Sequence, residues 1–219
     1  DNSYWGIILA DSHNNSIIEN YIIDNVVGIE LVVDSGNNII SGNNITNHAV
    51  GVSLYAASNN TISANSITNS NSSIGFLASN YNSIIGNTLM GNELGIYFLQ
   101  SYNNSIYDNS FINNTKQVYD QIWIQPWYPQ LLSVNFWDNG TIGNYWSNYN
   151  GTDNDSDGIG DTPYIIDENN QDNFPLTEQF IIPEFPSWAP LLIMLVAATV
   201  LAIIYKRKLH NTLSPSNYD

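Results

Sequence analysis

The sequence predicts an all-β fold, a solenoid in which each repeat forms one rung of a parallel β-helix. A motif of the form Asn-(Ser/Thr/Ile)-Ile-x-x-Asn occurs five times before residue 116, and neighbouring copies begin 22 or 23 residues apart. Alternate residues are apolar on either side of the motif, which is the period of a β-strand. No part of the repeat region keeps the period of about 3.6 residues that a helix requires.

The repeats occupy residues 1–116, where we expect short strands separated by Asn, Ser and Gly turns. Parallel stacking places equivalent residues of successive rungs above one another, so each inward-facing position becomes an apolar column. One such column consists of Ile7, Ile29, Val52, Ile74 and Ile96. The chain begins inside a repeat and lacks an initiator Met and a signal peptide. We therefore expect a mature or truncated form whose first rungs are incomplete.

The second asparagine of the motif is predicted to form a ladder of stacked side chains at a turn. Asn tolerates left-handed backbone geometry, and its amide can bond the equivalent residue in the rungs above and below. The ladder residues are Asn20, Asn43, Asn65, Asn87 and Asn109. A row of sugar-binding asparagines is the alternative. The structural role is favoured, because apolar columns flank this position in the repeat.

Residues 117–180 are expected to form a cap over the last rung. The repeat period stops near Lys116, and Trp, Tyr and Phe become denser beyond it. A parallel edge needs such a cover, because its unpaired backbone groups would otherwise recruit another strand. The alternative is a platform of aromatic rings that stacks against sugars, with Trp137, Tyr145 and Trp146 as its candidate residues.

Within the cap, an aspartate-rich loop matches the first three-quarters of a calcium-binding loop. Its candidate ligands are Asp153, Asp155, Asp157, the backbone carbonyl of Ile159, and Asp161. The last position of the loop holds Tyr164 in place of the usual Glu, so the closing ligand must come from elsewhere, with Asp167, Glu168 or Asp172 as candidates. We expect a structural calcium ion that is bound weakly, with a dissociation constant on the order of 10⁻⁴ M. A metal-free turn is the alternative.

The charge balance and the residue types exclude several functions. The chain holds 20 acidic and four basic residues, so its surface should repel nucleic acid, and no nucleic-acid partner is expected. Cysteine is absent, which excludes disulfides and thiolate metal sites.

The repeats themselves offer no recognisable catalytic group. A polysaccharide lyase needs a base such as Lys or Arg, and the rungs hold none before Lys116. A hydrolase needs carboxylates that converge from neighbouring rungs, whereas the acids of this region occupy scattered repeat positions. The two histidines, His13 and His48, also occupy different positions and are expected to be solvated turn residues. We therefore expect no catalytic residues.

The C-terminal part is predicted to hold the protein on a membrane. A Pro-rich linker, residues 181–187, precedes an uncharged apolar stretch, residues 188–205, which is just long enough for a transmembrane helix. Trp188 and Tyr205 occupy the two interfaces, and the basic tail, residues 206–219, is expected in the cytoplasm. The solenoid would then be extracellular on a single-pass membrane protein. Pro183-Glu184-Phe185 also resembles an archaeal sorting signal that a membrane protease removes, although the tail is longer than such signals usually are.

Nine Asn-x-Ser/Thr sequons permit glycosylation of an extracellular protein. The acceptor residues are Asn14, Asn44, Asn59, Asn71, Asn103, Asn113, Asn139, Asn150 and Asn154.

The rungs, followed by the segments 143–164 and 172–176, resemble the NosD-like and carbohydrate-binding or sugar-hydrolase repeat families, common on archaeal surfaces. The resemblance covers residues 1 to about 180 and implies a right-handed parallel β-helix. Combined with the residues above, it favours a calcium-stabilised, non-catalytic scaffold that binds a cell-surface glycan or an S-layer. The alternatives are a fragment of a polysaccharide hydrolase, lyase or epimerase, and an accessory protein for metal delivery. The two Met residues, Met90 and Met194, and the scattered His residues argue against metal delivery.

Overall fold

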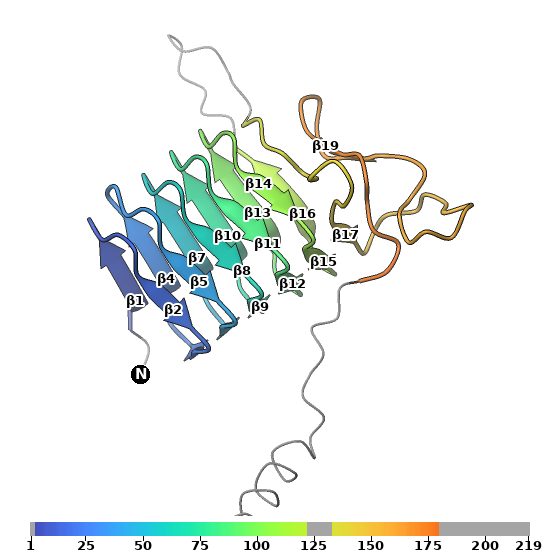
Figure 1. Ribbon diagram of the computed structural model, residues 1–219. Coiled ribbons are helices and arrows are strands. Elements are labelled where there is room, and N and C mark those ends of the chain that lie inside the picture. Colours follow the sequence, from blue (N-terminus) through green and yellow to red (C-terminus); the bar gives the residue numbers. More distant parts are fainter. Residues whose placement is uncertain (1–2, 122–132, 180–219) are drawn as a thin grey trace, which may run out of the picture. The chain divides into compact units, whose positions relative to one another are not determined.

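The computed structural model describes residues 3–121 and 133–179, and these residues form a parallel β-solenoid (Figure 1). Five three-stranded rungs of about 22 residues are stacked along its axis, and the described residues contain no helix. Accordingly, none of them belongs to a helix that could cross a membrane. The expected linker, transmembrane helix and basic tail all lie outside the described residues.

The rungs build three parallel sheets, which we call sheets A, B and C. Sheet A contains β1 (Trp5–Ala10), β4 (Val27–Val32), β7 (Val50–Tyr55), β10 (Ser72–Leu77), β13 (Leu94–Leu99) and β16 (Lys116–Asp120). Sheet B contains β2 (Ser16–Ile18), β5 (Ile39–Ser41), β8 (Thr61–Ser63), β11 (Ser83–Ile85) and β14 (Ser105–Tyr107). Sheet C contains β3 (Tyr21–Ile23), β6 (Asn44–Thr46), β9 (Ser66–Thr68), β12 (Thr88–Met90), β15 (Ser110–Ile112) and β17 (Tyr145–Trp146). A short antiparallel pair, β18 (Tyr164–Ile165) and β19 (Gln171–Asp172), lies in the cap.

The register of the sheets is the one that the apolar columns predict. In sheet A, Ile7 pairs with Ile29, and the column continues through the later rungs to Ile96 and Val118. The members of this column in the second to fifth rungs are fully buried. A parallel sheet keeps like residues above like residues, so a single β-branched core position repeats as a continuous apolar ridge. The predicted boundary at residue 116 falls on the first residue of β16, so a sixth strand of sheet A still belongs to the solenoid.

Three columns of hydrogen-bonded polar side chains run through the turns between the strands. In the column that contains Asn65, each side-chain Oδ1 accepts hydrogen bonds from the backbone N–H and the side-chain amide of the rung before it. The members of this column are Asn20, Asn43, Asn65, Asn87 and Asn109. Those after Asn20 are buried. A second column uses the first asparagine of the motif, through Asn15, Asn38, Asn60, Asn82 and Asn104. The third column lies in the turn that follows each strand of sheet C in the rungs and consists of Asn25, His48, Ser70, Asn92 and Asn114.

The columns continue into the cap, which makes the cap an extension of the solenoid. Asn104 donates to Asn135, and Asn109 donates to Asn144, whose backbone N–H in turn donates to Asp172. Among the described residues, no buried side-chain nitrogen or oxygen lacks a hydrogen-bond partner. The described residues of the rungs and the cap accordingly belong to one compact unit.

Candidate functional site

The aromatic residues of the cap complete the core. Trp146 lies between Phe111 and Tyr164, with near-parallel rings whose centroids are 4.2 and 4.3 Å from its own. Trp137 packs against Trp146 at 5.8 Å, and only 2% and 1% of these two residues are exposed, respectively. The platform alternative is therefore wrong for Trp137 and Trp146, because no sugar can reach a ring face that the protein already covers. Tyr145 is half-buried in β17, above Ser110 of sheet C.

Asp172 ends one of the polar columns and is buried. Its carboxylate accepts hydrogen bonds from the backbone N–H groups of Asn144 and Phe174 and from the indole Nε1 of Trp146, at 2.7, 3.0 and 2.8 Å. The carboxylate also fills the space beside Gly143, where an added Cβ would lie 1.7 Å from an Asp172 oxygen. Asp172 is thus a structural acceptor enclosed by N–H donors, and its proposed role as a closing calcium ligand is wrong.

Burial raises the pKa of Asp172 to about 6, against the opposing effect of hydrogen bonds from Asn144, Trp146 and Phe174. The usual pKa is 3.8, so between about pH 4 and 6 the folded protein binds a proton that the unfolded chain releases. Stability is therefore greater at low pH and falls as the pH rises through this range, by about 3 kcal/mol.

An Asp172→Asn variant removes this titration. The unfolding free energy of the wild type, relative to that of the variant, should decrease by up to about 3 kcal/mol between pH 4 and 7. Urea unfolding at four or five pH values measures this difference. The control is Glu19→Gln, a substitution of an exposed acid. If the unfolding free energy of the wild type relative to that of Asp172→Asn stays constant or increases with pH, Asp172 is ionised throughout this range.

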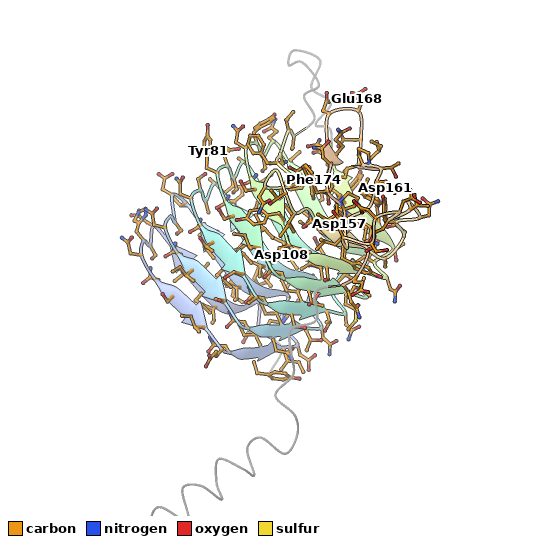
Figure 2. The ribbon with its side chains drawn as sticks, turned by 45° about the vertical axis from the view of Figure 1, so that its right-hand side comes forward. Tyr81, Asp108, Asp157, Asp161, Glu168 and Phe174 are labelled. Carbon is orange, nitrogen blue, oxygen red and sulfur yellow. The ribbon has the colours of Figure 1, made fainter. Side chains whose placement is uncertain are left out.

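The aspartate-rich loop brings three of its five predicted ligands together. Carboxylate oxygens of Asp153, Asp155 and Asp157 lie within 4.8 Å of one another, and Asp153 lies beside Thr177. Figure 2 shows Asp157 at the surface of the cap. Asp161 instead accepts hydrogen bonds from the backbone and the side-chain amide of Asn154 and does not belong to the cluster. We call the three clustered residues the aspartate trio.

The backbone of the loop already holds one member of the trio in place. Asp153 accepts hydrogen bonds from the N–H groups of Asp157 and Gly158, at 3.2 and 3.0 Å. The slight burial of this carboxyl raises its pKa, but hydrogen bonds from Gly158, Ser156 and Asp157 outweigh that effect and hold the pKa below its usual range. Asp153 is therefore kept as a carboxylate, the form that binds a hard cation such as calcium.

The three remaining predicted ligands have different surroundings. Both carboxylate oxygens of Asp167 accept from the side-chain amide of Asn170, which also donates to the carbonyl of Ser133, and Asp167 thus stabilises the end of a polar column. Glu168 is exposed on a separate loop (Figure 2). Ile159 forms an isolated bridge with Leu176. The residue after Leu176 is Thr177, and its hydroxyl lies 3.4 Å from Asp153. The hydroxyl of Thr177 is a further oxygen near the trio. The sequence does not predict this, because Thr177 lies far from the aspartates along the chain.

The two described histidines do not form a metal site. His48 is buried, and the prediction of a solvated turn residue is wrong for it. It replaces Asn in the third polar column, where its Nδ1 accepts from the N–H of Asn25 and its Nε2 faces the carbonyl of Ile22. The imidazole thus supplies one acceptor and one donor, in place of the oxygen and one of the two N–H groups of an Asn amide. His13 is half exposed, and its Nδ1 accepts from the N–H of Gly36 in a turn, as predicted.

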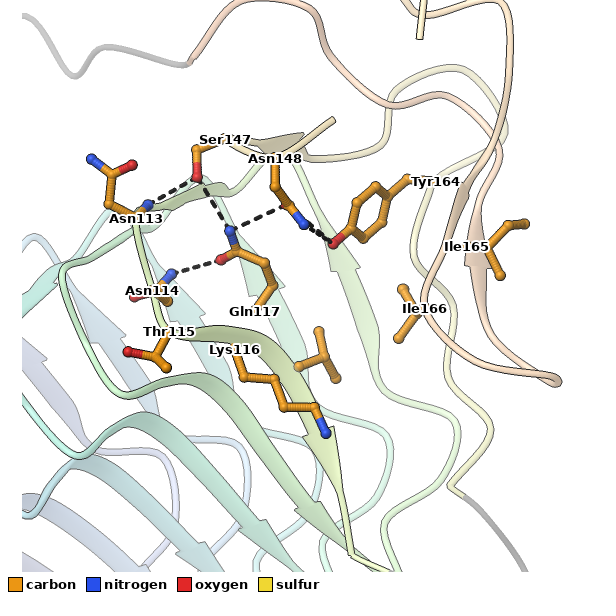
Figure 3. A pocket seen from close by; sticks show the side chains of 11 residues that line it. Asn113, Asn114, Thr115, Lys116, Gln117, Ser147, Asn148, Tyr164, Ile165 and Ile166 are labelled. Carbon is orange, nitrogen blue, oxygen red and sulfur yellow. Dashed lines mark hydrogen bonds between the residues drawn. The ribbon is translucent and has the colours of Figure 1, made fainter. Parts of the chain in front are cut away.

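A pocket of about 440 Å³ lies between β16 and the cap (Figure 3). Gln117 bonds Asn114, Ser147 and Asn148 across it, and Asn148 also bonds the Tyr164 hydroxyl. Its one basic side chain, Lys116, has its Nζ 4.3 Å from the centroid of the Tyr119 ring. Because most polar groups of the wall already bond one another, this pocket is best explained as a joint between the rungs and the cap.

All nine sequon asparagines are exposed, so the fold leaves each of them accessible.

A family model described as "Periplasmic copper-binding protein (NosD)" matches residues 1–151 of the chain. Among solved structures, the chain is similar to crystal structures of variants of the periplasmic alginate epimerase AlgG. For two of these the identities are 21% and 20%, and the TM-scores 0.45 and 0.46. Each similarity covers 54% of this chain and 36% of the epimerase, so the chain spans about a third of the length of these proteins. A search of curated proteins finds no match.

Proposed function

Since the chain belongs to the NosD family, we propose that it is a non-catalytic β-solenoid scaffold that binds a glycan of the cell envelope. The observation that carries the proposal is the separation of roles within each rung. The repeated asparagines are buried and bonded to one another, whereas the outward strand positions present hydroxyl groups, single exposed aromatic rings and exposed aliphatic side chains such as Ile18 and Ile39. Hydroxyl groups and aromatic rings are suited to sugars, which combine hydrogen-bonding groups with apolar ring faces.

The acidic residues of the rungs support binding in preference to catalysis. Glu30 is engaged by the indole N–H of Trp5 and by the hydroxyl of Ser53, both on the outer face of sheet A. Within residues 3–121 and 133–179, the single group of three or more acids or histidines arranged to hold a metal is the aspartate trio, which lies in the cap. The second candidate is an enzyme that acts on a polysaccharide. Its catalytic residues would then lie in rungs that this sequence does not include.

Copper binding, which the description of the family names, does not fit the described residues. Copper sites use imidazole, thiolate or thioether ligands. The chain has no cysteine, and both nitrogens of His48 contact backbone groups. Within residues 3–121 and 133–179, the exposed His13 belongs to no cluster of three or more His, Cys, Asp or Glu residues that could hold a metal. The oxygen ligands of the trio are of the type that calcium prefers. We therefore do not propose a role in copper delivery.

We propose that the aspartate trio binds calcium and stabilises the cap. Three clustered carboxylates repel one another without a cation, and the backbone hydrogen bonds to Asp153 favour its charged form. At 10 mM calcium, about a hundred times the expected dissociation constant, binding would stabilise the fold by about 2.7 kcal/mol. The melting temperature of the wild type should therefore be higher in calcium than in EDTA.

The matched variants are Asp155→Asn, in the trio, and Glu19→Gln, an exposed acid of the first rung. The calcium-dependent increase should disappear in Asp155→Asn and persist in Glu19→Gln. Equal melting temperatures of the wild type in calcium and in EDTA would rule out the site.

We further propose that residues 188–205 anchor the solenoid on the outer side of a membrane. The support is the apolar stretch between Trp188 and Tyr205, followed by the three basic residues. The family is described as periplasmic, which is compatible with a solenoid on the outer side of the membrane. The mass of the native C-terminus tests whether a sorting protease removes the anchor, and protease digestion of intact cells tests on which side the solenoid lies.

Glycan binding is tested on an array of neutral and acidic envelope saccharides. The full-length chain in detergent should bind a subset of the spots, and an unrelated acidic β-protein should not bind them. If no saccharide is retained above the level of this control, the proposed function fails.

A further inference from the structure

One turn position of the solenoid has the same left-handed backbone in all five rungs. Its residues are Asn14 (φ 58°), Asn37 (φ 58°), Asn59 (φ 61°), Tyr81 (φ 57°) and Asn103 (φ 57°). Asn is one of the few residues that adopt this conformation readily, whereas a bulky side chain is strained in it. Tyr81 is the exception in this column, and it is the one aromatic residue with a positive φ among residues 3–121 and 133–179. Strain of this kind often marks a functional position.

The fold gives no structural reason for a tyrosine at this turn. The N–H of Tyr81 donates to the carbonyl of Tyr102 at 3.3 Å, and the N–H of Asn59 makes the equivalent bond to Asn80 at the same distance. An asparagine could therefore form the same turn. The Tyr81 ring does not add to the core either, since 61% of the residue is exposed. The ring is thus kept on the surface in spite of its backbone cost.

A second exposed ring lies near Tyr81. Phe136 is 58% exposed and forms an isolated bridge with Ser105 of β14, at the end of sheet B. The two rings border a shallow depression of about 420 Å³, whose wall also includes Ser83, Asn103 and Ser105. Ser83 and Ser105 are paired on neighbouring strands, so their backbones bring two hydroxyl groups side by side between the rings. Figure 2 shows Tyr81 at the turn edge of the rungs.

These groups match the two surfaces of a sugar ring. The C–H face of a pyranose packs against an aromatic ring, and its hydroxyl groups bond to side-chain hydroxyls and amides. The wall of the depression carries no charged side chain, and the chain as a whole is strongly acidic. An anionic sugar would be repelled by this field without a cation to hold it. A neutral sugar is therefore the ligand that the depression fits.

We propose that the depression between Tyr81 and Phe136 binds one neutral hexose unit of a glycan. This inference rests on the proposed glycan-binding function and assigns it a place and a ligand class. Asn103, in the wall, is also a sequon acceptor, and an attached glycan would fill the same space. The mass of the peptide that contains Asn103 distinguishes the two, and full glycosylation of Asn103 in the native protein would overturn the proposal.

The test variant is Tyr81→Asn, which restores the residue of the other four turns. Because this change also creates a sequon with Ser83, the variant and the wild type are both produced in a host that does not attach N-linked glycans. It should unfold at a higher temperature than the wild type and should bind the neutral saccharide identified on the array about tenfold more weakly by calorimetry. A gain in stability together with a loss of binding cannot arise from misfolding. Phe136→Ala should weaken binding similarly. The matched control is Tyr21→Asn, because Tyr21 is also exposed and pairs with Asn44 of the next rung.

Each outcome distinguishes the subsite from the general function. Weaker binding by Tyr81→Asn and unchanged binding by Tyr21→Asn support the subsite. Unchanged binding by Tyr81→Asn, or binding of acidic glycans alone, overturns the subsite and leaves glycan binding in place. If the wild type binds no saccharide, the subsite and the proposed function both fall.

Discussion

Replacing Asn65 by Ala is expected to lower the free energy of unfolding by about 4 kcal/mol, because the side chain makes four buried hydrogen bonds, each worth about 1 kcal/mol. Its Oδ1 accepts the backbone N–H and the amide of Asn43, both at 2.9 Å. Its amide donates to the carbonyl of Ile40 at 2.9 Å and to the Oδ1 of Asn87 at 3.0 Å. Alanine would leave buried polar groups on both neighbouring rungs without these partners. Urea unfolding of the purified chain measures the loss.

The control for Asn65 is Asn20→Ala, at the first rung of the same column. Asn20 is exposed and donates to Asn43, and water can replace the bonds that alanine removes. We expect a loss of about 1 kcal/mol there. Equal losses in the two variants would mean that the column does not stabilise the rungs by enclosed hydrogen bonding.

Replacing Trp146 by Ala should destabilise the chain by about 4 kcal/mol, the range for a large aromatic side chain lost from a core. The substitution removes the ring between Phe111 and Tyr164 and the indole donor to Asp172. It therefore leaves both a cavity and a carboxylate with one donor fewer. The melting temperature and urea midpoint of the variant measure the effect.

Trp146→Phe separates the two contributions, because phenylalanine keeps a stacked ring and loses the hydrogen bond. We expect about 1 to 2 kcal/mol for this variant. Trp5→Ala, an exposed tryptophan of sheet A, is the control for removing an indole from the surface. If Trp146→Ala weakened saccharide binding and left stability unchanged, the ring would have to be a sugar platform after all.

The sequence predicts the rungs well because their positions repeat. A fixed period defines the columns, so strand register, apolar core and the ladder of Asn65 follow from a single alignment. The same alignment also held the signal for Tyr81, since Asn precedes the motif in four copies and Tyr in the remaining one. The sequence alone does not give this tyrosine a role, because the role of an exposed turn residue depends on its backbone geometry and its neighbours.

The cap was harder to predict because its spacing departs from the repeat. Asn104 and Asn135 bond across 31 residues and Asn109 and Asn144 across 35, compared with 22 or 23 within the rungs. No period therefore indicated that the columns continue, or that Asp172 would end one of them. The place of His48 in a polar column could not be predicted for a different reason. An imidazole replaces an Asn amide only when both ring nitrogens have backbone partners, which the sequence does not reveal.

Binding without turnover is the central claim, and the fate of the bound saccharide tests it most directly. A saccharide retained on the array would be incubated for a day with the full-length chain and with calcium, and its mass, reducing ends and sugar composition would then be measured. We predict saturable binding and an unchanged saccharide. New reducing ends, unsaturated products or an altered sugar composition, formed in proportion to the protein added, would contradict the scaffold and identify an enzyme.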